Sequence, residues 1–283
     1  MQKFEDLYIQ ANDIRHHLRK WSSGNATQPP ILCLPGLTRN VLDFDDIGPL
    51  LADNTARDVY AMSFRGRGQS DYAQDYLTYT PMHYAADVLA VLDDLALPRV
   101  AILGTSLGGI VGMVLGATVP DRLTRLVLND IGPELAEAGL ARIAGYAGLD
   151  QAHANWDVAA AMSRQVNEVA FPDASPEFWG KFARRTYVQA EAGLVTAYDK
   201  NIAKAFVEAG PAPDLWPLFT LLSCPILTLH GALSDLLTPE IVDKMIAAKP
   251  EMLTIDVANV GHAPSLEEPA AQHALKSFFS AAA

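Results

Sequence analysis

Short apolar runs alternate with longer stretches of mixed polarity along most of the chain, a pattern typical of alternating strands and helices. Two β-like segments, Phe4–Gln10 and Ile14–Trp21, predict a hairpin at a sheet edge, with His16 and His17 on an exposed strand. Further strands are predicted at Ile31–Leu34, Asp58–Phe64, Val100–Leu103, Leu123–Leu128, Pro225–Leu229 and Leu253–Val257. Helices are predicted at Phe44–Leu51, Pro81–Leu97, Pro239–Ala248 and Ala270–Phe279, and from Gly109 onward. Repeated strand–helix units indicate a parallel sheet covered on both faces.

The region from Pro133 to Pro213 interrupts this alternation. It predicts helices and few strands, and it is rich in aromatic residues. Because the region is too long for a simple connection, we expect an inserted subdomain. We therefore divide the chain into a core, residues 1–132 and 214–283, and a helical cap, residues 133–213. The insertion leaves the sheet at the carboxyl end of a strand, where ligands bind in open α/β sheets, so it is placed to roof a site.

The stretch Val100–Gly109 turns from a buried strand into an apolar helix within one residue. Its centre, from Gly104 to Gly108, has the pattern Gly-x-Ser-x-Gly. At such a corner the backbone is strained and the side chain is pushed out of the packing. The flanking residues must be small, because the two backbones approach closely. We therefore predict Ser106 as a nucleophile; the structural alternative is a glycine-containing turn whose serine caps the helix.

A serine hydroxyl needs a base to accept its proton and an acid to orient that base. His262 lies directly after the last predicted strand, and we predict it as the base. Asp235 follows the strand Pro225–Leu229 and completes the chain order Ser, Asp, His, so we predict it as the acid. The competitor is Asp130, which follows the preceding strand and could reach a similar point; otherwise it is a hinge residue at the start of the insertion.

Two backbone N–H groups are expected to stabilise the negatively charged oxygen that forms during acyl transfer. One is that of Leu107, directly after the nucleophile, and the other is that of Leu37, in the loop after Ile31–Leu34. Arg65 and Arg67 follow the next strand. We interpret them as part of a structural turn beneath these loops and not as an anion site.

Composition and charge limit the possible functions and locations of the protein. The chain has 283 residues, half of them apolar, and a net charge of −12, which argues against nucleic-acid binding. Its two cysteines, Cys33 and Cys224, lie beside predicted buried strands. We interpret them as core thiols of a protein in a reducing compartment. We find no signal peptide, no apolar run long enough to span a membrane and no cluster of metal ligands. We therefore expect a cytoplasmic protein without a metal or other cofactor.

With these residues the chain resembles the α/β-hydrolase superfamily, and within it the capped, single-domain esterases and lactonases of bacteria. The resemblance covers essentially the whole chain and rests on Pro35-Gly36, Arg65-Gly66-Arg67-Gly68-x-Ser70, Gly104-x-Ser106-x-Gly108-Gly109, Gly231-x-x-x-Asp235 and Gly261-His262. It implies a mostly parallel eight-stranded sheet with helices on both faces and a helical cap after the sixth strand. It also implies Ser106 as nucleophile, His262 as base and Asp235 as its partner. Many relatives have His-Gly where this chain has Pro35-Gly36, a difference that keeps the backbone donor but changes the packing of the loop.

The resemblance predicts a serine hydrolase that cleaves a small-molecule carboxylic ester, or a lactone, through an acyl-enzyme. Ser106 argues against the dehalogenases and epoxide hydrolases of this fold, which carry aspartate at the corner. Thr105 disfavours the carbon–carbon hydrolases, which often carry asparagine before the serine. Carbon–carbon hydrolysis, acyl transfer and perhydrolysis remain alternatives on the same fold, and a non-catalytic ligand-binding receptor is the alternative of another class. The sequence leaves the oligomeric state open.

Overall fold

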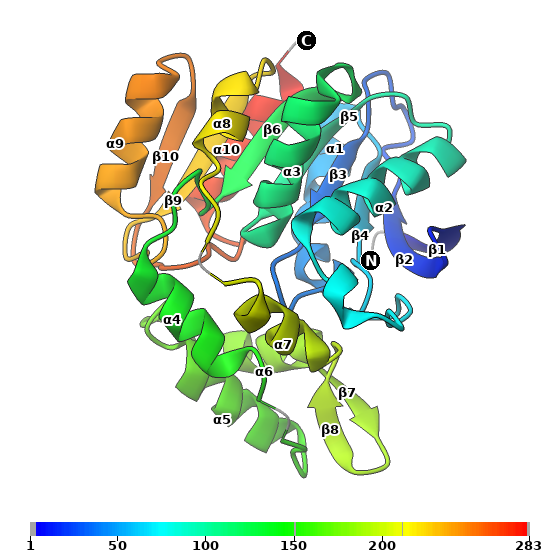
Figure 1. The fold of residues 1–283 in the computed structure, drawn as a ribbon, viewed down its shortest axis with the longest axis vertical. Helices are drawn as coiled ribbons and strands as arrows, with labels where there is room; N and C mark the ends of the chain where they lie inside the picture. Colours follow the sequence, from blue (N-terminus) through cyan, green and yellow to red (C-terminus); the bar gives the residue numbers. More distant parts are fainter. Residues whose placement is uncertain (1–3, 150, 211, 282–283) are drawn as a thin grey trace.

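The computed structural model describes residues 4–149, 151–210 and 212–281, and its centre is an eight-stranded sheet (Figure 1). The strands lie in the order β1-β2-β4-β3-β5-β6-β9-β10. Their bounds are β1 Phe4–Ala11, β2 Ile14–Trp21, β3 Ile31–Leu34, β4 Val59–Met62, β5 Val100–Thr105, β6 Leu123–Asn129, β9 Ile226–Gly231 and β10 Leu253–Val257. Strand β2 pairs antiparallel with β1 and β4, whereas the other neighbours pair in parallel. The predicted mostly parallel sheet is confirmed.

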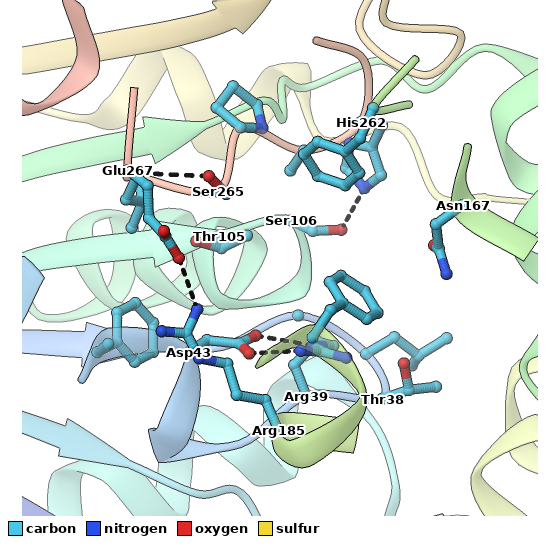
Figure 2. Close-up of a pocket in the computed structure, with 18 of the residues that line it drawn as sticks. Thr38, Arg39, Asp43, Thr105, Ser106, Asn167, Arg185, His262, Ser265 and Glu267 are labelled. Carbon is cyan, nitrogen blue, oxygen red and sulfur yellow. Dashed lines mark hydrogen bonds and ion pairs between the residues drawn. The ribbon is translucent and has the colours of Figure 1, made fainter. Parts of the chain in front are cut away.

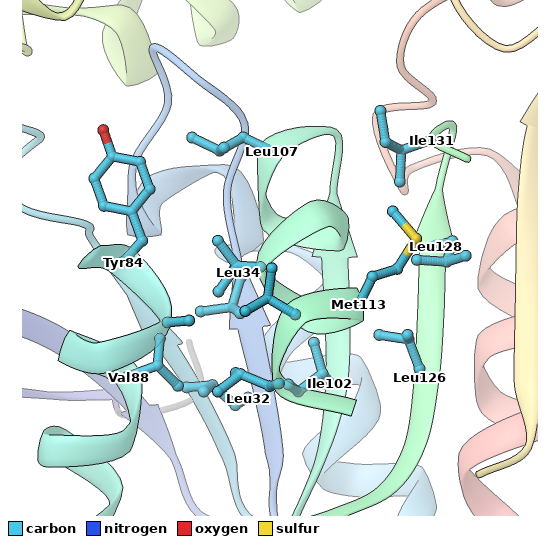
Figure 3. Packing of buried hydrophobic residues seen from close by; sticks show 14 of the residues in the cluster. Leu32, Leu34, Tyr84, Val88, Ile102, Leu107, Met113, Leu126, Leu128 and Ile131 are labelled. Atoms are coloured by element: carbon cyan, nitrogen blue, oxygen red, sulfur yellow. The ribbon is translucent and has the colours of Figure 1, made fainter. Parts of the chain in front are cut away.

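Helices cover both faces of the sheet, because side chains of the central strands alternate between two buried layers. In β3, Leu32 and Leu34 belong to one layer, and Ile31 and Cys33 to the other. The first layer is covered by α2 (Pro81–Asp94), α3 (Leu107–Thr118), α8 (Trp216–Leu221) and α9 (Pro239–Ala248), and the second by α1 (Ile47–Thr55) and α10 (Pro269–Ser280). Figure 3 shows leucines of β3 and β6 packed against α2 and α3. None of the described helices is long and apolar enough to cross a membrane.

The chain between β6 and α8 forms a separate layer beyond the carboxyl ends of the parallel strands (Figure 1). Its elements are α4 (Glu137–Tyr146), α5 (Trp156–Asn167), α6 (Pro176–Thr186), β7 (Tyr187–Ala190), β8 (Gly193–Thr196) and α7 (Asn201–Glu208). The layer is mostly helical, as the sequence predicts, but it also contains the antiparallel hairpin β7–β8, which the sequence analysis did not predict. The subdomain boundaries at residues 133 and 213 remain a prediction.

The amino-terminal hairpin differs from its predicted environment. His16 and His17 were expected on an exposed strand, yet both are buried. Strand β2 is an inner strand, and the segment after β4 folds over it: the Ser63 N–H donates to the carbonyl of His17 at 2.9 Å, and the His17 N–H donates to the Ser70 hydroxyl at 2.9 Å. The backbone of His17 is therefore bonded to a segment about fifty residues away in the sequence, and the ring of His16 lies 3.8 Å from Asp87 of α2.

Candidate active site

Ser106 occupies the corner between β5 and α3. Its backbone has φ 51° and ψ −117°, a conformation that is strained for a residue with a side chain. The two glycines around it are required by the close contact of strand and helix: a Cβ on Gly104 would lie 2.5 Å from the carbonyl carbon of Gly108. The Gly-x-Ser-x-Gly stretch thus has the strand–turn–helix context that the sequence predicts.

His262 lies in the loop between β10 and α10, and its ring approaches Ser106. The Nε2 atom is 2.9 Å from the Ser106 hydroxyl oxygen (Figure 2). The other ring nitrogen, Nδ1, is 2.8 Å from Oδ2 of Asp130. Because an ionised carboxylate only accepts hydrogen bonds, Nδ1 carries the proton and Nε2 is left to accept one from Ser106.

Asp130 is the residue directly after β6, with a left-handed backbone at φ 55°. Its side chain is fully buried, where a carboxylate needs hydrogen-bond donors. Besides His262, the Gly231 N–H donates to Oδ1 at 2.7 Å and the Ser234 hydroxyl donates to Oδ2 at 2.6 Å. The last residue of β9 and the loop after it therefore each supply a donor that orients the carboxylate toward the histidine.

His262 is hydrogen-bonded to Asp130 and not to Asp235, and this differs from our prediction. Its carboxylate forms a two-pronged ion pair with Arg142 of α4, with Nε–Oδ2 at 2.5 Å and Nη2–Oδ1 at 2.7 Å. The hydrogen bond from Arg142 holds the pKa of Asp235 below its usual value. Strands β6 and β9 are neighbours in the sheet, so aspartates after either strand come near the histidine. Arg142 forms an ion pair with Asp235, and Asp130 contacts the histidine ring.

The loop after β3 is fixed from beneath by Arg67. This guanidinium is fully buried, and its Nε donates to the carbonyl of Leu37 at 2.9 Å, while Nη1 donates to the Tyr84 hydroxyl at 2.7 Å. Arg65 is engaged by Asp87 in a buried two-pronged ion pair. Both arginines are thus bonded within the protein, as the interpretation of a structural turn requires.

Of the two residues predicted to supply oxyanion donors, Leu37 lies in the loop after β3 and Leu107 directly follows Ser106. Leu37 lines the pocket that contains Ser106 and His262. Leu107 is the first residue of α3, so its N–H is one of the four at a helix start that have no acceptor within the helix. That these two N–H groups bind an oxyanion remains a prediction.

A pocket opens over Ser106 and His262. The inserted segment contributes Ile143, Phe171, Phe178 and Phe182 to its apolar wall, and the core contributes Leu37, Phe44, Pro264 and Leu266. Its polar side carries two ion pairs, Arg39 with Asp43 and Arg185 with Glu267 (Figure 2). Within the described part of the chain, no group of three or more His, Cys, Asp or Glu residues is arranged to hold a metal ion.

Comparison with known proteins agrees with this geometry. Residues 29–269 match the family model described as the alpha/beta hydrolase fold. The 3-hydroxybutyrate-oligomer hydrolase of Cupriavidus necator is 32% identical over 279 residues, which cover 94% of this chain and 94% of that protein. The crystal structure of an alpha/beta hydrolase from Novosphingobium aromaticivorans is 39% identical and superposes with a TM-score of 0.92 over 99% of both chains. The likeness thus extends through the inserted segment as well as the sheet.

Proposed function

Because the chain belongs to the alpha/beta hydrolase fold family, we propose that it is a serine hydrolase that cleaves a small-molecule carboxylic ester or lactone through an acyl-enzyme. The observation that carries the proposal is the unbroken series of hydrogen bonds from Ser106 through His262 to Asp130. An ester substrate is supported by the relative from Cupriavidus necator, which is named as a hydrolase of 3-hydroxybutyrate oligomers.

In the first half of the reaction, the Ser106 oxygen attacks the ester carbonyl carbon while His262 Nε2 accepts the hydroxyl proton. Asp130 keeps the ring in the required tautomer and stabilises the imidazolium that forms. The N–H groups of Leu37 and Leu107 bind the oxyanion, and each contributes about 3 kcal/mol to transition-state stabilisation. When the carbon–oxygen bond breaks, the imidazolium gives its proton to the leaving alkoxide, and the acyl group stays on Ser106.

In the second half, water enters where the alcohol has left. His262 takes a proton from this water as it attacks the acyl-enzyme, and then returns the proton to the Ser106 oxygen as the acid departs. A lactone follows the same steps, except that the leaving hydroxyl remains part of the acyl chain. The inserted segment acts as the cap: its phenylalanines cover the acyl-enzyme and restrict the approach of solvent.

The test is hydrolysis of p-nitrophenyl butyrate, together with labelling by a fluorophosphonate that reacts with activated serines. We expect Ser106→Ala to lower kcat by about 10⁴-fold or more and to abolish labelling. The matched control is Ser265→Ala, because Ser265 also lines the pocket but its hydroxyl is bonded to Glu268 at 2.8 Å. That variant should still be labelled at Ser106. Full activity of folded Ser106→Ala protein would contradict the proposal.

A further inference from the structure

A second cavity lies between the inserted segment and the loop after β3, and it adjoins the pocket over Ser106. The two share part of their walls, namely Thr38, Arg39, Tyr146, Asn167 and Phe182. The second cavity, here called the inner chamber, continues to His153, Ser163, Tyr187, Thr196 and Tyr198. A substrate whose ester group lies at Ser106 can therefore extend past Arg39 into the inner chamber.

The inner chamber is lined mostly by apolar and uncharged polar side chains, with one guanidinium at its boundary. Among the described residues that line it, Arg39 is the one cation and none is an aspartate or glutamate. The pocket over Ser106 differs, because Asp43 and Glu267 line it as well as Arg39, Lys181 and Arg185. An anionic group in the inner chamber would therefore meet Arg39 without a carboxylate in the lining, whereas beside Ser106 it would lie near Asp43 and Glu267.

Arg39 is held rigidly at the boundary between the two cavities. Its Nε and Nη2 donate to Asp43 at 2.8 and 2.6 Å, and its Nη1 donates to the Thr186 hydroxyl at 2.5 Å. The guanidinium also lies 4.2 Å from the centre of the Phe182 ring. A guanidinium has five N–H groups, and these bonds use three of them. One N–H on each Nη atom therefore remains for a ligand.

Three phenols supply further donors. Burial raises the pKa values of Tyr146 and Tyr187, and it raises the pKa of Tyr198 to about 12. All three are therefore protonated at neutral pH. The charge of Arg39 acts against the rise in pKa at each of these tyrosines, which places the guanidinium within electrostatic reach of all three hydroxyls.

We propose that the inner chamber binds a carboxylate of the substrate, so that the enzyme acts on short esters that carry a free carboxylate in addition to the ester group. A carboxylate can accept from the two remaining N–H groups of Arg39 and from the phenols, and charge-assisted bonds of this kind are the strong ones. Arg39 follows the predicted oxyanion residue Leu37 by two positions, so one loop binds the ester carbonyl and the carboxylate. The inference rests on the proposed ester hydrolysis at Ser106.

Two matched substrate pairs test the proposal. Ethyl hydrogen adipate against ethyl hexanoate places the carboxylate on the acyl side, and 4-(butyryloxy)butanoate against butyl butyrate places it on the alcohol side. Product release is followed by chromatography at pH 7. We expect kcat/KM of the anionic ester to exceed that of its neutral partner at least about tenfold in one pair. Equal values, or preference for the neutral ester in both pairs, would overturn the proposal.

Variants connect the preference to the inner chamber. Arg39→Gln and Tyr187→Phe should each lower the ratio of the two kcat/KM values, Arg39→Gln toward one. The ratio does not depend on the fraction of folded enzyme, and Tyr187→Phe removes only a hydroxyl. Tyr8→Phe is the matched control, because this exposed tyrosine of β1 is bonded to Gln69 outside the site. A ratio that stays at its original value in both chamber variants would refute the assignment.

Binding without turnover separates this inference from the proposed function. In Ser106→Ala protein, calorimetric titration should give a dissociation constant for the preferred anionic ester about tenfold or more below that of its neutral partner. Failure of the wild-type protein to hydrolyse either ester would count against the proposed function. Hydrolysis of both esters with equal binding would count against the inner-chamber carboxylate site alone.

Discussion

At the scale of single residues, the site depends on which of two aspartates meets His262. Asp130 is fully buried and accepts hydrogen bonds from His262, Gly231 and Ser234. Asp235 is partly exposed and is neutralised by Arg142. A carboxylate that orients a histidine must be free of a competing cation, because an arginine partner would take its lone pairs and offset its charge. Asp130 meets this condition, and Asp235 does not.

Substitution of each aspartate by asparagine should distinguish the roles of Asp130 and Asp235. We expect Asp130→Asn to lower kcat for p-nitrophenyl butyrate by about 10³–10⁴-fold, because an amide no longer fixes the tautomer that leaves Nε2 free. Asp235→Asn should change kcat by less than about tenfold, because it removes an ion pair that lies outside the Ser106–His262–Asp130 series. Circular dichroism of both variants controls for folding. The reverse order of effects would make Asp235 the acid.

The sequence could predict Ser106 and His262 as neighbours, because each lies directly after a strand and the carboxyl ends of parallel strands meet at one edge. The chain order leads us to predict Asp235 as the acid, yet the rule of strand ends does not separate it from Asp130, since both follow strands that are neighbours in the sheet. The decision depends on Arg142, which lies in the inserted segment 93 positions from its partner. Sequence spacing contains no information on such a contact.

At the scale of elements, the position of α3 on the sheet is set by its glycines. A Cβ on Gly108 would lie 2.1 Å from the carbonyl oxygen of Leu34 in β3. Neither atom can move without shifting a backbone at the centre of the fold. By contrast, a Cβ on Gly180, within α6, would have no atom within 4 Å. Close packing against β3 therefore requires glycine at position 108, whereas no close contact requires it at position 180.

This contrast predicts opposite effects of the same substitution. We expect Gly108→Ala to lower the free energy of unfolding by at least about 3 kcal/mol, because the added methyl group collides with backbone. Gly180→Ala should raise it by about 0.5–1 kcal/mol, because alanine has the higher helix propensity and the methyl group has free space. Urea unfolding of both variants measures the change. Wild-type stability of Gly108→Ala would show that α3 can move away from β3.

The ion pair between α4 and the loop after β9 predicts a pH dependence of stability. The pKa of Asp235 is lowered in the folded protein, chiefly by the Arg142 hydrogen bond. Its stabilising effect is therefore complete above the unfolded pKa of about 4 and is lost as the pH falls through the lower, folded value. We expect Asp235→Asn to be less stable than wild type by about 1 kcal/mol at pH 7, with the difference shrinking below about pH 4.

Urea unfolding of wild type and Asp235→Asn at a series of pH values measures this difference. Asp173→Asn is the control, because Asp173 is an exposed aspartate of the same inserted segment. A difference between wild type and Asp235→Asn that grows as the pH falls would contradict the expected sign.

At the scale of the whole molecule, the inserted segment is held to the sheet layer by charged contacts of α6. Lys181 lies 2.5 Å from Asp46 and 2.9 Å from Glu267, and Arg185 pairs with the same two carboxylates. Asp46 directly precedes α1, and Glu267 lies just before α10. The sequence predicts these helices but gives no sign of the network, because each carboxylate is more than eighty residues from the cations that it pairs with. The network joins the wall of the active-site pocket to one face of the core.

Removal of one carboxylate from this network should lower the stability of the inserted segment and of the core together. Glu267→Gln leaves Arg185 and Lys181 with one carboxylate, and we expect a loss of about 1–2 kcal/mol and a decrease in Tm of about 2–4 °C for each kcal/mol. Glu251→Gln, at an exposed position, is the control.

The loss of unfolding free energy in Glu267→Gln should shrink in about 1 M salt. The Debye length there is about 3 Å, and it screens the contacts of Lys181 more than those of the less exposed Arg185. Differential scanning calorimetry measures both effects. A single shifted transition would show that the inserted segment and the core unfold as one unit, whereas an unchanged Tm at low salt would mean that apolar packing alone holds α6 in place.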